Sequence, residues 1–240
     1  MARALLPFLG DQDEVYGYTY EGENLSNKHR TANLIGASGH KQEQGPYLWK
    51  HSTAKWVKKK IGTKKWKSYF KFSVVRNPYD IYLSLFHWWK KSKGKWDPIP
   101  TGYRGIYKKV NPMNFDEYIC SEHKWDYTLL DYLTTGGRAP DDVDEEGNLN
   151  IGIDLDLVGR YDSLRLDFSY ICGRIGLPNL RLYRENESRV LDNRRHVSSF
   201  LKGEKARSIL LEKHALELDY FEYDLSNYNE YAETWEKYMM

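Results

Sequence analysis

The order of apolar and polar positions predicts strands and helices in turn along the first part of the chain. Glu14–Tyr20 is rich in aromatic and β-branched residues, which is typical of a strand. Ser52–Ile61 has apolar residues at helical spacing, a polar start and Gly62 directly after it, so it predicts a short capped helix. Tyr69–Val75 is an uninterrupted aromatic and β-branched run and predicts a buried strand.

A tight turn and a longer helix are expected after this second strand. Asn77 can cap a helix, and Pro78 suits the first helical position. The helix is predicted over residues 78–91. Its apolar stripe, expected to face the core, consists of Ile81, Leu85, Trp88 and Trp89.

The rest of the chain continues the alternation of helices and strands. A further strand is predicted at Ile151–Tyr161. Further helices are predicted at residues 115–120, 127–133, 162–175 and 204–218. No internal repeat is present, and 240 residues suffice for one large core, so we expect a single α/β domain over residues 1–240.

Composition and charge narrow the classes of function. The 36 Lys and Arg residues nearly balance 34 Asp and Glu, and a net charge of +2 argues against a nucleic-acid partner. Cys120 and Cys172 are the two cysteines, and no Cys/His cluster has zinc spacing, so no metal site is predicted. No apolar run approaches the ~20 residues that a membrane span requires.

Arg76 and Ser84 are candidates for binding an anion. The pattern puts Arg76 at the carboxyl end of a strand and Ser84 two turns into the next helix. A helix N-terminus, a guanidinium and a hydroxyl together suit a phosphate, and ligands of open α/β sheets lie at the carboxyl ends of strands. From the spacing alone, an ion pair of Arg76 with Asp80 and simple packing of Ser84 is an equal alternative.

The segment Tyr69–Ser84 resembles the 3′-phosphate motif of membrane-type and bacterial carbohydrate sulfotransferases, whose signature is an Arg and a Ser eight residues apart. The similarity extends over about residues 47–225. It implies a three-layer α/β fold of the P-loop nucleotide-kinase type, with a parallel sheet flanked by helices. It also implies that Arg76 and Ser84 bind the 3′-phosphate of the sulfuryl donor, 3′-phosphoadenosine 5′-phosphosulfate (PAPS). The acceptor would be a carbohydrate hydroxyl, and no metal would take part.

One part of the family pattern is missing from the sequence. The family holds the 5′-phosphosulfate with a loop of the type Pro-Lys-Thr-Gly-Gly-Thr-Ser, and this chain has none. Residues 36–41 are glycine-rich but fail the GxxxxGK pattern. Residues 1–9 read like the helix that would follow the loop, so we expect an N-terminally truncated domain. The alternative is a catalytically inactive relative that binds nucleotide or glycan.

Catalysis on a hydroxyl acceptor needs a general base. His51 is the first candidate and His40 the second, and a capping or packing role for His51 is an equal alternative. Trp96 and the neighbouring lysines suit contact with a sugar ring and its anionic groups. A cytoplasmic location is expected, or a Golgi location if an anchor lies upstream.

Overall fold

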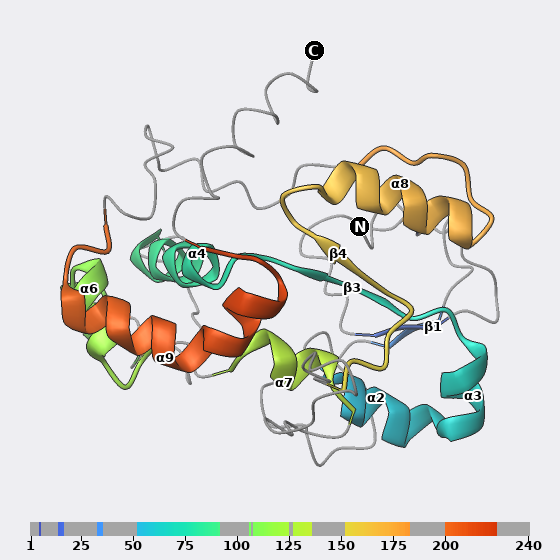
Figure 1. Cartoon of the computed structure of the whole chain (residues 1–240), viewed down its shortest axis with the longest axis horizontal. Coiled ribbons are helices and arrows are strands. Elements are labelled where there is room, and N and C mark those ends of the chain that lie inside the picture. Colours follow the sequence, from blue (N-terminus) through green and yellow to red (C-terminus); the bar gives the residue numbers. More distant parts are fainter. Residues whose placement is uncertain are drawn as a thin grey trace. The chain divides into compact units, whose positions relative to one another are not determined.

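The structure is a computed structural model of the 240-residue chain, with helices and strands in mixed order (Figure 1). The chain divides into two compact units, one of residues 1–74, 130–159 and 164–184 and the other of residues 75–129, 160–163 and 185–240. The single-domain interpretation remains a prediction. The residues described are 5, 14–16, 33–35, 52–91, 106, 108–124, 127–135, 152–182 and 200–224.

A small parallel sheet lies in the first unit. Strand β1 (Glu14–Tyr16) pairs with strand β2 (Asn33–Ile35), and Glu14 stands opposite Asn33. The strand predicted at Glu14–Tyr20 is therefore confirmed for its first three residues. Residues 17–20 lie outside the described part of the chain.

Helix α2 (Ala54–Ile61) confirms the predicted capped helix. The Thr53 hydroxyl accepts a hydrogen bond from the Trp56 N–H at 3.2 Å, which caps the start. Gly62 ends the helix with a φ of 84°, a conformation that favours glycine. Helix α3 (Thr63–Ser68) follows at once and was not predicted, because Trp66 is its single large apolar residue and gives no helical period.

Strands β3 (Phe72–Val75) and β4 (Leu157–Arg160) pair with each other. The Lys71 carbonyl accepts a hydrogen bond from the Leu157 N–H, the first of β4, at 3.1 Å. The Val75 carbonyl accepts one from the Tyr161 N–H at 2.7 Å. Because both sets of partners advance in the same direction along the sequence, the two strands are parallel. Their carboxyl ends therefore meet at one edge.

The strand predicted over Tyr69–Val75 is correct in type and wrong in extent and burial. Tyr69 caps the end of α3 and is 54% exposed. Within β3 only Val75 is buried. Helix α8 (Leu164–Arg174) follows β4 and buries Phe168 and Cys172 in a small apolar cluster. An aromatic run thus predicted a strand but did not reveal how much of it a neighbouring element covers.

The core of the second unit forms between helices. Helix α4 (Pro78–Lys91) packs against α6 (Phe115–Cys120) and α9 (Glu204–Tyr220), and α6 packs against α9. Phe86 lies at the centre, with ring centroids 5.4 Å from Phe115 and 5.6 Å from Tyr118. Helix α7 (Leu129–Leu133), of which residues 130–133 belong to the first unit, confirms the end of the helix predicted over residues 127–133.

The predicted core stripe of α4 is largely wrong. Trp89 is buried as expected, whereas Trp88 is 44% exposed and Ile81 and Leu85 are only half-buried. Apolar residues occur on almost every side of this helix, so several stripes fit the sequence, and the packing partners choose one of them. The other apolar residues that α4 buries are Tyr79, Tyr82, Leu83 and Phe86.

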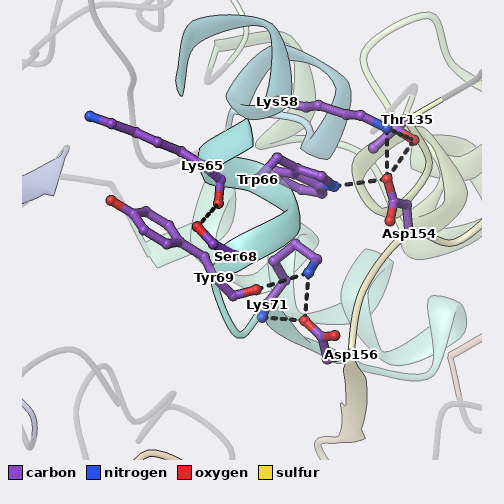
Figure 2. A network of polar contacts seen from close by, with 9 residues as sticks. All are labelled: Lys58, Lys65, Trp66, Ser68, Tyr69, Lys71, Thr135, Asp154 and Asp156. Atoms are coloured by element: carbon purple, nitrogen blue, oxygen red, sulfur yellow. Dashed lines mark hydrogen bonds and ion pairs between the residues drawn. The ribbon is translucent and has the colours of Figure 1, made fainter. Parts of the chain in front are cut away.

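Two aspartates fasten the segment before β4 to the rest of the first unit (Figure 2). The Asp154 carboxylate accepts from Lys58 Nζ at 2.7 Å and from Trp66 Nε1 at 2.8 Å, which joins it to α2 and α3. The Asp156 carboxylate accepts from the backbone N–H of Lys71 at 2.7 Å and forms an ion pair with Lys71 Nζ at the same distance. These bonds set where β4 begins beside β3.

We expect acid to weaken this part of the structure. The hydrogen bond from Lys58 lowers the pKa of Asp154, and the hydrogen bond from Lys71 lowers that of Asp156. A carboxyl with a lowered folded-state pKa stabilises the fold above its unfolded value of about 3.9, and this stability is lost as pH falls through the folded value. Asp154→Asn should lower the melting temperature at pH 7 by no more than about 2–4 °C, because the pair is partly exposed.

Thermal melts between pH 7 and pH 2 check this expectation. The difference between wild type and Asp154→Asn should shrink as pH falls through the lowered pKa of Asp154, because the wild-type carboxyl then becomes protonated. Glu212→Gln is the matched control, because Glu212 is exposed on α9. A difference between wild type and Asp154→Asn that stays constant over the whole pH range would contradict the electrostatic explanation.

Candidate anion-binding site

The turn between β3 and α4 is held by Asn77. Its side-chain oxygen accepts from the Tyr79 N–H at 3.0 Å and so caps α4. Its side-chain nitrogen donates to the Asp224 carbonyl at 2.8 Å. The predicted cap is confirmed, and the chain beyond α9 helps to fix the turn that carries Arg76.

Arg76 lies at the carboxyl end of β3 between a carboxylate and an aromatic ring. Its Nε forms an ion pair with Asp80 in the first turn of α4, and its guanidinium carbon lies 4.5 Å from the Tyr161 ring centroid. The alternative that the spacing left open, an ion pair with Asp80, is therefore present. A guanidinium has five N–H donors, more than one carboxylate uses, so this pair does not exclude an anionic ligand. The Arg76 side chain is 29% exposed and that of Asp80 only 7%.

Ser84 lies on the side of α4 that carries Asp80. Residues four apart in a helix share a face, so Asp80 and Ser84 stand one turn apart on it. Ser84 is half-buried. The first turn of α4 also presents backbone N–H groups and the positive end of the helix dipole. Arginine, helix start and serine are thus carried by one strand–turn–helix segment.

Three residues near the end of β4 were not singled out from the sequence. They are Arg160, Asp162 and, from the chain after α9, Tyr223. Arg160 has its guanidinium carbon 4.5 Å from the Tyr223 ring centroid and its Nη2 3.8 Å from Asp162 Oδ2. Burial raises the pKa of Asp162 and outweighs the opposing effect of Arg160. Burial likewise raises the pKa of Tyr223 far above its ordinary value. An arginine at the end of the predicted strand Ile151–Tyr161 was the available signal, the same one that pointed to Arg76.

A family model described as the Sulfotransferase family matches residues 17–224, which is 208 of the 240 residues. The chain belongs to the sulfotransferase family. The match includes the Arg76 turn, Ser84 and the end of β4. Comparison with curated proteins and with solved structures gives no significant match.

Several predicted residues of this sulfotransferase lie outside the described part of the chain. They include both candidates for the general base, His51 and His40, and the candidate sugar contact Trp96. The described chain resumes at Ser52, directly before the cap of α2. Their roles remain predictions.

Among the described residues, no group of three or more His, Cys, Asp or Glu side chains is placed to hold a metal ion. None of the helices in the same ranges is long and apolar enough to cross a membrane.

Proposed function

We propose that this sulfotransferase transfers the sulfuryl group of PAPS to a hydroxyl of a carbohydrate, on a three-layer α/β domain of the nucleotide-kinase type. Sulfuryl transfer follows from the family, whereas the donor and the acceptor are part of the proposal. The observation that carries it is Arg76 at the carboxyl end of β3, joined through a capped turn to the helix that carries Ser84. Both residues match the positions that bind the 3′-phosphate in the resembling sulfotransferases.

Arg76, Ser84 and the first N–H groups of α4 would hold the 3′-phosphate and so fix the nucleotide part of the donor. A fixed nucleotide aligns the sulfur with the attacking hydroxyl, which lowers the entropic part of the barrier. As the hydroxyl oxygen forms its bond to sulfur, the bond between sulfur and the bridging phosphate oxygen breaks. His51 would accept the hydroxyl proton, and the products would be a sulfate ester and 3′,5′-ADP.

Asp80 would modulate this binding without preventing it. Its carboxylate neutralises part of the charge on Arg76, but it is the more buried partner of the pair. An anion arriving from solvent therefore meets the guanidinium before the carboxylate. The ion pair also holds the arginine in one position before the nucleotide binds, so less side-chain entropy is lost on binding.

Calorimetric titration with 3′,5′-ADP tests the proposal. Wild type should bind, and Arg76→Ala should bind about 10- to 100-fold more weakly, since a hydrogen bond to a charged group is worth about 1.5–3 kcal/mol. Arg181→Ala is the matched control, because Arg181 is an exposed arginine of the first unit and its loss changes the net charge equally. Its affinity should equal that of wild type.

Two results would contradict the proposal. One is a folded wild-type chain that does not bind 3′,5′-ADP, and the other is an Arg76→Ala variant that binds as tightly as wild type. Transfer of sulfate from PAPS to desulfated polysaccharides, followed by mass spectrometry, then separates an active enzyme from an inactive relative. The inactive relative would bind the nucleotide without forming a sulfate ester.

A further inference from the structure

Helix α9 ends in a turn with a residue in the left-handed region of the backbone. Glu222 has a φ of 53°. The Tyr223 N–H donates to the Leu218 carbonyl at 2.8 Å, and the Glu222 N–H donates to the Asp219 carbonyl at 3.1 Å. These two bonds form the Schellman motif, which ends a helix and turns the chain away from its axis. Glycine is the usual residue at the left-handed position, so a glutamate adopts it at a conformational cost.

Buried aromatic side chains anchor the segment that follows α9. Phe221 and Tyr223 are 8% and 4% exposed, and their ring centroids lie 6.3 Å apart. The Tyr223 ring also contacts Arg160, whose guanidinium carbon lies 4.5 Å from the ring centroid. Closely packed rings leave a short segment little freedom. The backbone of the next residue, Asp224, is therefore held in a defined position.

Asn77 connects this segment to the start of α4. Its side chain is buried, and the amide nitrogen donates to the Asp224 carbonyl at 2.8 Å. The amide oxygen accepts from the Tyr79 N–H at 3.0 Å and caps the helix. All of these residues belong to the second unit. One side chain thus joins the end of α9 to the beginning of α4.

Capping uses only half of the Asn77 side chain. An N-cap needs an acceptor oxygen, which serine, threonine or aspartate supplies as well. The amide nitrogen serves the bond to Asp224 instead. Arg76 directly precedes Asn77, and its partner Asp80 lies in the first turn of the helix that Asn77 caps. A shift of Asn77 would therefore move both Arg76 and the carboxylate that holds it.

We propose that residues 221–224 are a positioning element of the phosphate site, and that Asn77 is the positioning residue through which they fix the orientation of Arg76. The inference rests on the proposed function and adds to it what sets the preference for a nucleotide with a 3′-phosphate. Asn77 acts through Arg76 and does not itself touch the ligand. An arginine that is already fixed in its binding position loses less entropy when the phosphate arrives.

Asn77→Ser tests the role of the amide nitrogen. Serine is an equally good helix cap, so the cap is kept while the hydrogen bond to Asp224 is lost. In calorimetry, the variant should bind 3′,5′-ADP about 3- to 10-fold more weakly than wild type. Its affinity for 5′-AMP, which has no 3′-phosphate, should be unchanged. A merely structural role would not alter the ratio of these two affinities.

Asn114→Ser is the matched control, because Asn114 caps α6 through the same kind of bond, to the Glu117 N–H at 2.9 Å. It should leave both affinities as in wild type. An Asn77→Ser variant that binds 3′,5′-ADP as wild type does, or that loses affinity for both nucleotides alike, would overturn the assignment.

Glu222 supplies a second test that leaves Arg76 and Asn77 intact. Glu222→Gly and Glu222→Val remove the same exposed carboxylate, but only glycine favours a φ of 53°. The valine variant should bind 3′,5′-ADP about 3- to 10-fold more weakly than the glycine variant, because valine disfavours the turn that positions Asp224. Equal affinity of the two variants would contradict the role of the segment, even if Asn77→Ser failed to fold.

The two proposals fail in distinguishable ways. If Arg76→Ala loses 3′,5′-ADP while Asn77→Ser behaves as wild type and the two Glu222 variants bind alike, the segment after α9 has no part in binding and the proposed function stands. If folded wild type does not bind 3′,5′-ADP, the proposed function is contradicted and this inference falls with it. A thermal melt of each variant establishes that it is folded before its affinity is compared.

Discussion

Replacing Glu217 by alanine is expected to lower the free energy of unfolding by about 3–5 kcal/mol, because it removes one partner of a buried hydrogen-bonded pair. His214 and Glu217 lie on α9 and are 3% and 1% exposed. His214 Nδ1 lies 2.6 Å from Glu217 Oε2, within hydrogen-bond distance. His214 Nε2 lies 3.1 Å from the hydroxyl of Tyr82, which is fully buried on α4. The loss would leave the imidazole without its carboxylate in a site closed to water.

Urea unfolding of Glu217→Ala and Glu212→Ala measures this effect with a matched control. Glu212 lies on the same helix but is exposed, so its replacement should change the unfolding free energy by no more than about 0.5 kcal/mol. Glu217→Gln keeps the shape and an acceptor oxygen and should fall between the two. Equal stability of the two alanine variants would contradict the importance of the buried pair.

The same pair has a functional consequence. Tyr82 stands two residues before Ser84 on α4, and the imidazole between Tyr82 and Glu217 fastens α4 to α9. A loosened contact would allow the helix that carries Ser84 and begins at the Arg76 turn to shift. We therefore expect Glu217→Ala to weaken binding of 3′,5′-ADP even at temperatures where most of the chain is folded.

Local signals predicted the elements of the fold better than its packing. The Thr53 and Gly62 caps of α2, and the Asn77–Pro78 start of α4, act through neighbouring residues and could be read from the sequence. Helix α3 carries a single large apolar residue and had no period to detect. The buried side of α4 depends on α6 and α9, which lie far away in the sequence, so its apolar pattern alone could not identify it.

For the candidate site too, the sequence predicted the residues of one local segment but not those that distant segments bring to it. Arg76 and Ser84 belong to one strand–turn–helix segment, and their spacing was sufficient to predict where they stand on it. Arg160 lies at the same sheet edge as the Arg76 turn only because β4 pairs with β3, and Tyr223 contacts it only because the chain after α9 returns to the end of β4. Such pairings depend on contacts between distant segments, which a single sequence does not specify.

His51→Ala is expected to lower kcat for sulfuryl transfer by about 100- to 10,000-fold, the usual contribution of a general base. A hydroxyl is a weak nucleophile until a base removes its proton, whereas the nucleotide is held by Arg76 and Ser84. Affinity for 3′,5′-ADP should therefore stay as in wild type while turnover falls. General-base catalysis makes the rate depend on the protonation of the base, so the pH profile of the wild-type rate should be changed in the variant.

Steady-state transfer from PAPS to the polysaccharide acceptor, measured between pH 5 and pH 9, separates the two candidate bases. His40→Ala is the matched variant, because it removes the same side chain from the second candidate. If His51→Ala keeps both its turnover and its pH profile while His40→Ala loses them, the base has been assigned to the wrong histidine. If His51→Ala loses nucleotide affinity together with turnover, His51 acts by positioning the segment before α2, since a base that acts only on the acceptor leaves donor affinity unchanged.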